Sequence, residues 1–213
     1  EATLTVSTTV VFANAWFAWN MGSFQMANPA VAVRLSAVDS LVDFARGDVD
    51  VAVRAGTGNW SGVTAEFLFD AHVTPMCSPA YLAALGGSLS PADLLRLPLI
   101  GSEDRWWPQW LEAAGVETAP GMRPNMRMDS QAHAGNAVIA GQGVAMLTPF
   151  FWRNDIADGK LVLDGIAGNV IVFADRPVRA AGHETTDLFI SRWSDGKDSF
   201  SKDPPNATIS ILG

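Results

Sequence analysis

Polar side chains stand at the ends of two expected strands, where they could bind a small molecule. The strand expected over residues 31–35 leads to Asp39 and Ser40, and the strand expected over residues 49–53 leads to Arg54. Ligands of open parallel sheets bind beyond the carboxyl ends of the strands. A carboxylate, a hydroxyl and a guanidinium at that edge could together hydrogen-bond a small polar ligand.

Arg54 has two interpretations from the sequence. It could bind a carboxylate through two parallel hydrogen bonds. It could instead stabilise the fold by pairing with Asp39, Asp50 or Glu66, and the residues slightly favour this structural role.

Signatures of catalysis and of metal binding are largely missing. The chain has no Gly-x-Ser-x-Gly elbow, no His-Glu-x-x-His helix and no Walker phosphate loop. The glycines of residues 56–58 lack the third glycine and the following helix of a dinucleotide site. His72, His133 and His183 do not have zinc-ligand spacing. Cys77 is better explained as a buried thiol than as a nucleophile, because no His partner can be assigned to it. We therefore expect no catalysis, no metal and no cofactor.

Strands and helices alternate along the chain, which predicts an α/β fold. Residues 31–35 alternate apolar and polar side chains as a strand does, and Gly47 ends a short helix that Asp39 or Ser40 would cap. The strands on either side of this helix should form a parallel pair. The expected strands cover residues 4–6, 31–35, 49–53, 66–68, 72–77, 99–100, 125–128, 144–147, 161–163 and 170–173. The expected helices cover residues 12–27, 41–45, 80–85, 91–95, 107–114, 130–140 and 185–193.

The helix expected over residues 12–27 is apolar on more than one side. Its large apolar side chains are Phe12, Trp16, Phe17, Trp19, Met21, Phe24 and Met26. A single core-facing stripe does not need so many, so we expect part of this helix to contact a partner.

Size and composition limit the class of protein. The 213 residues are 48% hydrophobic and 17% charged, as in an ordinary globular protein. No apolar run approaches the ~20 residues that a membrane-spanning helix needs. The single cysteine excludes an internal disulfide. A formal charge of −8 without a basic run makes DNA binding by these residues alone unexpected.

A run of residues in the first quarter of the chain carries a family pattern. The matching positions are Pro29, Leu35, Asp39, Val42, Asp43, Val49, Asp50, Val51, Ala52, Val53, Arg54 and Gly56. Further family phrases follow in order at residues 77–79, 90–94 and 141–145. Over roughly residues 2–195 the chain resembles the effector-binding domain of LysR-type transcriptional regulators, especially the glycine-cleavage and beta-lactamase regulators.

The resemblance implies two Rossmann-like lobes joined by two crossover strands, the type-2 periplasmic-binding-protein fold. The crossovers are expected near residues 69–72 and 174–177. Lobe one would comprise residues 1–70 and 175–200, and lobe two residues 71–174. Residues 201–213 would form a peripheral tail, and the DNA-binding domain of such regulators is expected to be absent from this chain.

The resemblance also implies a ligand site between the lobes, formed by four segments. The implied ligand-binding residues are Ser7, Thr8, Thr9, Val11, Val38, Asp39, Ser40, Gly101, Ser102, Arg105, Trp106, Asp129, Ser130 and Gln131. Two segments begin helices, whose free N–H groups suit a carboxylate or another anion. The hydroxyls among them could equally serve as helix caps.

Two positions depart from the family pattern. Val11 stands where the family often has Ser or Thr, and Ala55 where it commonly has an aromatic residue. Both changes predict a less polar and roomier cleft, or one whose ligand differs from that of its relatives. Trp106 and Trp107 could supply stacking faces instead, or could pack in the core.

The implied function is ligand sensing in a bacterial, cytoplasmic transcription factor. A small metabolite of unknown identity, with a carboxylate as one candidate group, would close the lobes. The chain would form a homodimer, or a tetramer in the full-length protein, by packing helix 12–27 against helix 130–140 of a second copy. DNA would be bound only through the missing domain, and no membrane would be involved. Two alternatives stay open: a periplasmic solute-binding protein of a transporter, and a dehydratase-like enzyme using Asp39 or Glu103.

Overall fold

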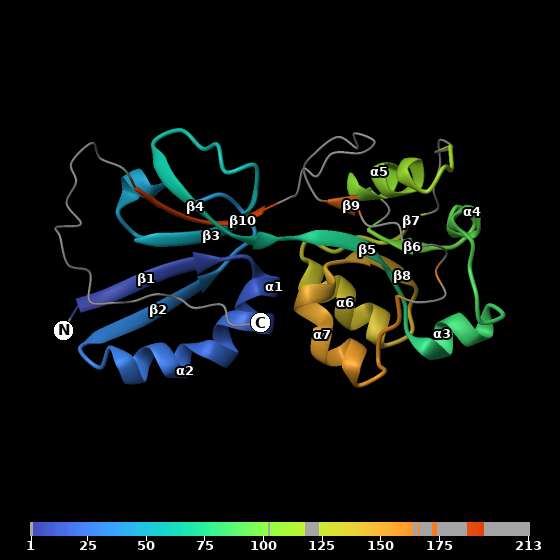
Figure 1. Cartoon of the computed structure of the whole chain (residues 1–213), viewed down its shortest axis with the longest axis horizontal. Coiled ribbons are helices and arrows are strands. Elements are labelled where there is room, and N and C mark those ends of the chain that lie inside the picture. The colour runs from blue at the N-terminus through green and yellow to red at the C-terminus, as the bar shows by residue number, and fades with distance from the viewer. Residues whose placement is uncertain are drawn as a thin grey trace.

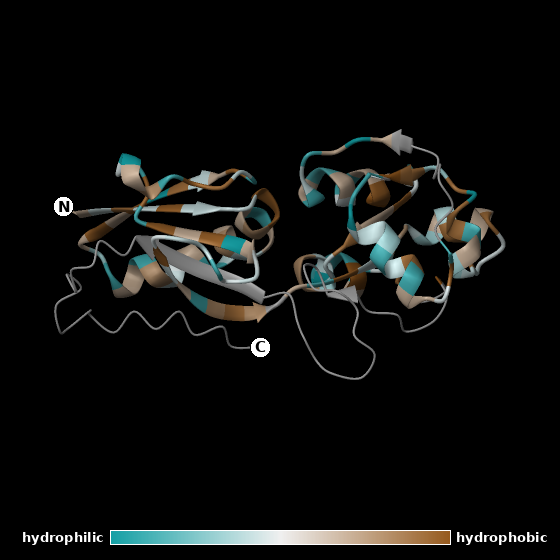
Figure 2. Ribbon diagram, turned by 90° about the horizontal axis from the view of Figure 1, so that it is seen from above, coloured by the Kyte–Doolittle hydropathy of each residue, from teal (hydrophilic) through white to brown (hydrophobic). Residues whose placement is uncertain are grey.

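A computed structural model describes residues 2–101, 103–117, 124–163, 166, 172–173 and 187–193. These residues form two five-stranded sheets that lie side by side, each with its own helices (Figures 1 and 2). We call the sheet that contains the first strand, with its helices, lobe one, and the other sheet with its helices lobe two. The predicted α/β class is confirmed.

The sheet of lobe one has the strand order β2-β1-β3-β10-β4. Its strands are β1 (Ala2–Thr8), β2 (Val31–Ala37), β3 (Val51–Gly56), β4 (Val63–Asp70) and β10 (Asp187–Trp193). β1 pairs in parallel with both β2 and β3. The strands expected to form a parallel pair are therefore parallel but not adjacent, because β1 lies between them.

The helix predicted over residues 185–193 is wrong. This segment is the strand β10, which pairs antiparallel with β3 on one side and β4 on the other (Figure 1). Its sequence, DLFISRW, contains Phe, Ile and Trp, which favour strands. The two neighbouring strands, distant in sequence, decide its conformation.

The sheet of lobe two has the strand order β7-β6-β8-β5-β9. Its strands are β5 (His72–Met76), β6 (Leu99–Ile100), β7 (Pro124–Met126), β8 (Val144–Leu147) and β9 (Val172–Phe173). β6 pairs in parallel with β7 and β8, whereas β5 pairs antiparallel with β8 and β9. The strand expected over residues 161–163 is reduced to one bridge between Val162 and Cys77.

The helices of lobe two were predicted well, with one exception. They are α3 (Pro79–Ala84), α4 (Pro91–Leu94), α5 (Trp106–Ala113), α6 (Gln131–Ile139) and α7 (Pro149–Ala157). In Figure 1, α5 lies above the sheet and α6 and α7 lie below it. The sequence analysis missed α7, because its aromatic residues are consecutive and do not recur at the spacing of an amphipathic helix.

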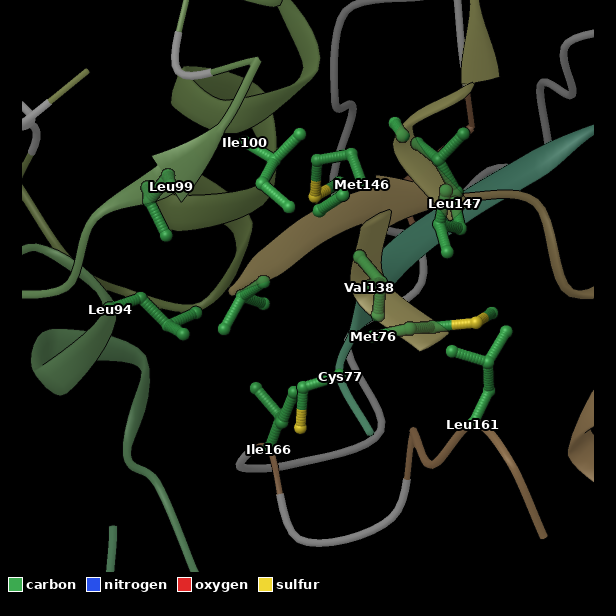
Figure 3. Close-up of a cluster of buried hydrophobic side chains, with 14 of the residues drawn as sticks. Met76, Cys77, Leu94, Leu99, Ile100, Val138, Met146, Leu147, Leu161 and Ile166 are labelled. Atoms are coloured by element: carbon green, nitrogen blue, oxygen red, sulfur yellow. The ribbon is translucent and has the colours of Figure 1, made fainter. Parts of the chain in front are cut away.

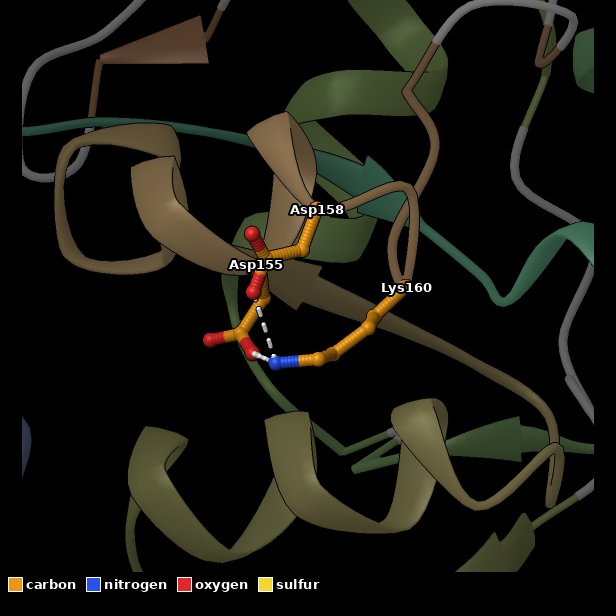
Figure 4. A network of polar contacts seen from close by, with 3 residues as sticks. All are labelled: Asp155, Asp158 and Lys160. Atoms are coloured by element: carbon orange, nitrogen blue, oxygen red, sulfur yellow. Dashed lines mark hydrogen bonds and ion pairs between the residues drawn. The ribbon is translucent and has the colours of Figure 1, made fainter.

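A network of charges follows the end of α7. Lys160 Nζ lies 3.1 Å from Asp155 and 2.9 Å from Asp158 (Figure 4). Because these side chains are exposed or half-buried, solvent screens both pairs and they contribute little to the stability of the fold.

The long helix of lobe one is built from three consecutive segments. These are α1 (Val10–Phe12), the π-helical η1 (Ala13–Phe17) and α2 (Ala18–Ala27). The prediction of a helix over residues 12–27 is confirmed. The π-helical turn carries Trp16 and Phe17, and such turns occur frequently at functional sites.

The helix predicted over residues 41–45 is wrong. A single 3-10 turn, η2 (Phe44–Arg46), replaces it, and Asp43 rather than Asp39 or Ser40 caps that turn. The Asp43 side chain accepts a hydrogen bond from Ala45 N–H at 3.0 Å. Gly47 ends the turn at φ 69°, as expected for a left-handed cap.

The chain passes from lobe one to lobe two between β4 and β5, at Asp70 and Ala71. It returns between β9 and β10, and the crossover expected near residues 174–177 lies outside the described residues. The lobe boundaries and the tail at residues 201–213 therefore stay predictions.

The largest buried cluster of the described residues fills lobe two. Figure 3 shows Met76, Cys77, Leu99, Val138 and Leu147 converging there from different strands and helices. Burial raises the pKa of the Cys77 thiol to about 11. The interpretation of this residue as a structural thiol fits its complete burial, because the reactive thiolate is then scarce at neutral pH.

Aromatic side chains join the two lobes. The ring of Phe69, at the end of β4, lies 4.3 Å from Phe150 and 6.1 Å from Phe151 of α7. Phe151 also meets Phe12 of α1 edge-on at 6.3 Å. These four rings, the interlobe aromatic cluster, fix α7 against lobe one beside the first crossover.

Candidate functional site

A cavity of about 300 Å³ lies between the two lobes. Both sheets contribute to it at the carboxyl ends of their parallel strands, as the sequence analysis expected. Lobe one contributes the turns after β1 and β2 and the end of β3. Lobe two contributes the turns after β6, β7 and β8 and the start of α6.

Eight of the fourteen predicted ligand-binding residues line this cavity. They are Thr9, Val11, Asp39, Gly101, Trp106, Asp129, Ser130 and Gln131. Five others do not line it, namely Ser7, Thr8, Val38, Ser40 and Arg105. Ser102 lies outside the described residues.

Two of the five residues outside the wall, Ser7 and Ser40, hydrogen-bond the cavity residue Arg54. Ser7 and Thr8 are completely buried. Ser7 Oγ accepts a hydrogen bond from Arg54 at 2.8 Å, and the Ser40 carbonyl accepts two more at 3.0 and 3.2 Å. The Ser7 hydroxyl and the Ser40 carbonyl thus hold Arg54 in place.

Arg54 is a buried cation that ties together the ends of three strands. Its side chain is 4% exposed, and it donates hydrogen bonds to Ser7, to Ser40 and to its neighbour Val53. None of the three carboxylates considered from the sequence forms a salt bridge with it in the described part of the chain. Burial lowers the pKa of the guanidinium, and the charge of Asp39 opposes this change. Arg54 therefore has a structural role, but it donates to neutral oxygens rather than to carboxylates.

Asp39 is another lobe-one residue of the cavity wall. Its Oδ1 accepts a hydrogen bond from Val10 N–H at 3.0 Å, in the first turn of α1. Thr9 caps the same turn through its hydroxyl, which accepts from Phe12 N–H at 3.4 Å. Thr9 and Asp39 thus both bond the first turn of α1. The hydroxyls of Ser7, Thr8 and Ser40, which were expected as alternative caps, cap none of the described helices.

Two helices of lobe two begin at the cavity and are bonded to each other. Ser130 caps α6 by accepting from Ala132 N–H at 3.3 Å. Gln131 Oε1 accepts from Thr148 N–H at 2.9 Å, at the start of α7, and its Nε2 donates to the Thr148 hydroxyl at 3.3 Å. The side chain of Gln131 therefore holds the two helix starts together.

The two tryptophans of α5 have different roles. Trp106 is half-buried and lines the cavity, whereas Trp107 is completely buried in the lobe-two core. The two departures from the family pattern, Val11 and Ala55, also lie on the cavity wall. Both positions therefore offer apolar side chains to the cavity, and the expectation of a less polar and roomier cleft stays a prediction.

Asp104 is the main cavity residue that the sequence analysis missed. It lies within the segment expected to bind, but its neighbour Arg105 was chosen instead, and Arg105 is exposed outside the wall. The Asp104 carboxylate accepts a hydrogen bond from Trp106 N–H at 3.1 Å. Burial raises the pKa of Asp104, while the Trp106 hydrogen bond and the charge of Arg105 oppose the change.

Two further cavity residues, Thr148 and Met128, could have been predicted from their positions at strand ends. Thr148 directly follows β8 and Met128 lies just beyond β7, so the strand-end rule that selected Asp39 would have found both. Phe151 had no such signal, because α7 itself was missed.

A second, smaller cavity of about 210 Å³ lies beside the first in lobe one. It shares Leu41 and Arg54 with the interlobe cavity and is otherwise mostly apolar, with Phe44 and Trp60 on its wall. Arg54 thus forms part of the wall of both cavities.

The described part of the chain contains neither a metal-binding cluster nor a membrane-spanning helix. No group of three or more His, Cys, Asp or Glu side chains is placed to bind a metal there. In the same residues, no helix has the length and apolar character to cross a membrane.

Comparison with known proteins gives a consistent family. A family model described as the LysR substrate binding domain matches residues 1–180. The HTH-type transcriptional activator AmpR of Rhodobacter capsulatus is 32% identical over 203 residues, which is 92% of this chain and 67% of that protein. The glycine cleavage system transcriptional activator of Escherichia coli (strain K12) is 32% identical over 163 residues, covering 76% of this chain but only 53% of that protein.

Solved structures show the same similarity. The effector domain of AmpR of Pseudomonas aeruginosa superposes with a TM-score of 0.74 at 28% identity, over 91% of this chain and 86% of that chain. The AmpR effector binding domain from Citrobacter freundii superposes with a TM-score of 0.76 over 93% of this chain and 92% of that one. At 22% identity, this second likeness concerns the fold.

Proposed function

This chain belongs to the LysR substrate-binding-domain family, and on that basis we propose that it senses a small metabolite for a LysR-type transcriptional regulator. Its fold is that of the type-2 periplasmic binding proteins. The observation that carries the proposal is the interlobe cavity, whose wall is formed by strand ends and helix starts of both sheets.

The cavity suggests how binding would act. A ligand that contacts both walls interacts more favourably with a closed arrangement of the lobes than with an open one. Such a difference in affinity shifts the population toward the closed arrangement. Closure would have to act through the first crossover, where Ala71 alone separates β4 from β5, and through the interlobe aromatic cluster beside it.

The output would be a change in transcription. The relatives are named as transcriptional activators, and this chain spans 53% of one and 67% of another. We propose that closure is transmitted to a DNA-binding domain outside these 213 residues and that the regulator works in the bacterial cytoplasm. The net charge of −8 fits a domain that does not itself bind DNA.

The two alternatives are less well supported. The matched relatives are regulators rather than transport proteins. Of the two carboxylates considered for an enzyme, Glu103 does not line the cavity, and its carboxylate pairs with Arg127 at 2.7 Å. Hydrogen bonds from its own backbone and from Arg127 lower the pKa of Glu103, which makes it a poor proton donor. We propose that the chain catalyses no reaction.

Ligand-dependent stabilisation tests this function. Amino acids, cell-wall peptides and aromatic acids are screened for an increase in the thermal midpoint of the 213-residue chain. A ligand at 100 times its Kd stabilises the fold by about 2.7 kcal/mol, which raises the midpoint by roughly 5–10 °C.

A cavity-filling variant provides the control. Ala55→Trp places a large ring into the cavity and should abolish the shift, whereas Ala32→Trp, on an exposed edge position of β2, should preserve it. A library without a single stabilising compound would contradict the proposed function.

The α2 helix supports the proposal of a homodimer. None of its residues is buried in the single chain, and Trp19 and Met26 are 74% and 80% exposed. The expected partner surface on the helix of residues 130–140 needs a correction, because Ala132, Ala134 and Val138 are buried in lobe two. A second copy could meet only the outer side of that helix.

Replacing one exposed side chain of α2 tests the dimer. Trp19→Glu should convert a dimer into a monomer in sedimentation experiments at tens of micromolar, because a charge would lie in an apolar interface. The matched change Leu85→Glu, at an exposed apolar position of lobe two, should leave the dimer intact. A monomeric unmodified chain would disprove this part of the proposal.

A further inference from the structure

The interlobe cavity has an unusual balance of charge for a site expected to bind an anion. Among the described residues, four charged side chains line it: the cation Arg54 and the carboxylates Asp39, Asp104 and Asp129. One cation therefore faces three carboxylates. A ligand carrying only negative charge would be repelled by most of this wall.

The charges of the lobe-one wall largely satisfy one another. Asp39 lies near Arg54 and accepts the hydrogen bond from Val10 N–H. The Nη1 atom of Arg54 donates only to the Val53 carbonyl among the described residues, at 2.8 Å. Since Nη1 carries two N–H groups, one remains for an acceptor on a ligand.

The lobe-two wall is different, because the charge of Arg105 offsets only part of the effect of burial on Asp104, and Asp129 is exposed. Neither Asp104 nor Asp129 forms a salt bridge within the described part of the chain. Asp104 is half-buried and receives one backbone hydrogen bond, from Trp106. Burial of this carboxylate outweighs both the Trp106 hydrogen bond and the charge of Arg105, so the pKa of Asp104 is raised. A positive group on a ligand would supply the missing partner.

From this arrangement, and resting on the proposed function, we infer that the effector is zwitterionic. It is an α-amino acid or a dipeptide with a free ammonium group. The ammonium binds to Asp104 and Asp129 of lobe two, and the carboxylate lies toward Arg54 of lobe one. Such a ligand joins the lobes through opposite charges at its two ends, which is what closure requires.

Asp129 has a second role at the start of α6, so a substitution there would change more than ligand binding. It immediately precedes Ser130, so its charge also favours the start of α6. Asp104 stands in the same place relative to α5, one residue before the cap Arg105, and it also accepts a hydrogen bond from Trp106 N–H. Asn at this position can still accept that hydrogen bond, so Asp104→Asn removes the charge and keeps the local geometry.

The test compares ligands that differ only in the amino group. Common α-amino acids and dipeptides of alanine, leucine and phenylalanine are titrated into the chain, each beside the carboxylic acid that lacks the amino group. We expect the amino compound that binds to do so about tenfold or more tightly than its counterpart, because a charged hydrogen bond is lost.

Asp104→Asn should remove this discrimination, so that the amino compound and its counterpart bind with similar affinity. Glu112→Gln, which neutralises an exposed carboxylate of α5 outside the cavity, should preserve the full ratio. The ligand-free thermal midpoint of Asp104→Asn should equal or exceed that of the unmodified chain, which shows that its fold is intact.

Two results would overturn the inference. One is equal binding of amino compounds and their counterparts by the unmodified chain. The other is an undiminished ratio in Asp104→Asn. In both cases a ligand still binds, so the proposed sensing function stands. If no amino compound binds but aromatic or other acids stabilise the chain, the inference also fails alone; if nothing stabilises it, both fail.

Discussion

Gly135→Ala is expected to destabilise the protein by about 2 kcal/mol, although the same change in most helices is favourable. Gly135 lies in α6, and a Cβ at this position would overlap the six-membered ring of Trp152 on α7. The ring has little space to move, because Trp152 is 7% exposed and packed in the lobe-two core. The added methyl group must therefore push α7 away from α6.

The expected loss combines two opposing effects. Alanine favours a helix over glycine by about 1 kcal/mol, whereas overpacking a rigid core costs about 1–3 kcal/mol and more where a ring is overlapped. Displacing α7 would also disturb the interlobe aromatic cluster, in which Phe150 and Phe151 take part. Urea or thermal denaturation followed by circular dichroism should show a midpoint lower by roughly 4–8 °C.

Gly22→Ala is the matched control. Gly22 lies in the helix α2, and nothing lies within 4 Å of a Cβ built there. This variant should be unchanged or more stable by up to about 1 kcal/mol. In a double-mutant cycle, Trp152→Leu should recover part of the loss caused by Gly135→Ala. Equal stability of the two alanine variants would contradict the close packing of α6 on α7.

Arg54→Met is expected to cost about 3 kcal/mol of stability and to abolish the ligand response. The change leaves the Ser40 and Val53 carbonyls and the Ser7 hydroxyl without the donor they share. Those groups lie at the ends of three strands, so the cavity wall loses its shape as well as its cation. Thermal denaturation without and with a stabilising ligand measures both effects.

Arg34→Met is the control for the loss of a positive charge. Arg34 is exposed on the edge strand β2, and its replacement should change stability by less than about 0.5 kcal/mol and preserve the ligand response. Arg54→Lys keeps the charge but not the planar fork, so its stability should fall between the other two. An Arg54→Met chain as stable as Arg34→Met would refute the structural role.

The sequence determined more of the fold than of the site. Strands such as β2 and β8 were predictable because their apolar pattern is local, and Ser130 was predictable as a cap because capping depends on neighbouring residues. β10 was not predictable, because β3 and β4 decide its conformation and both lie more than a hundred residues away.

The same contrast applies to the cavity. The ends of parallel strands pointed to Asp39 and Arg54, since this rule needs only the strand boundaries. Asp104 lines the cavity and its neighbour Arg105 does not, and the sequence does not show which of two adjacent residues faces the other lobe.

The two hydrogen bonds between Gln131 and Thr148 fix the orientation of the Gln131 side-chain amide. The two ends of a glutamine amide are hard to tell apart by shape, but a backbone N–H can only donate, so the atom facing Thr148 N–H must be the oxygen. The orientation of the amide is thereby locked, and its spare hydrogen has a fixed direction. A ligand that needed the reverse orientation would have to break the hydrogen bond to Thr148 N–H, so a ligand-binding role of Gln131 would favour ligands that accept from its amide N–H.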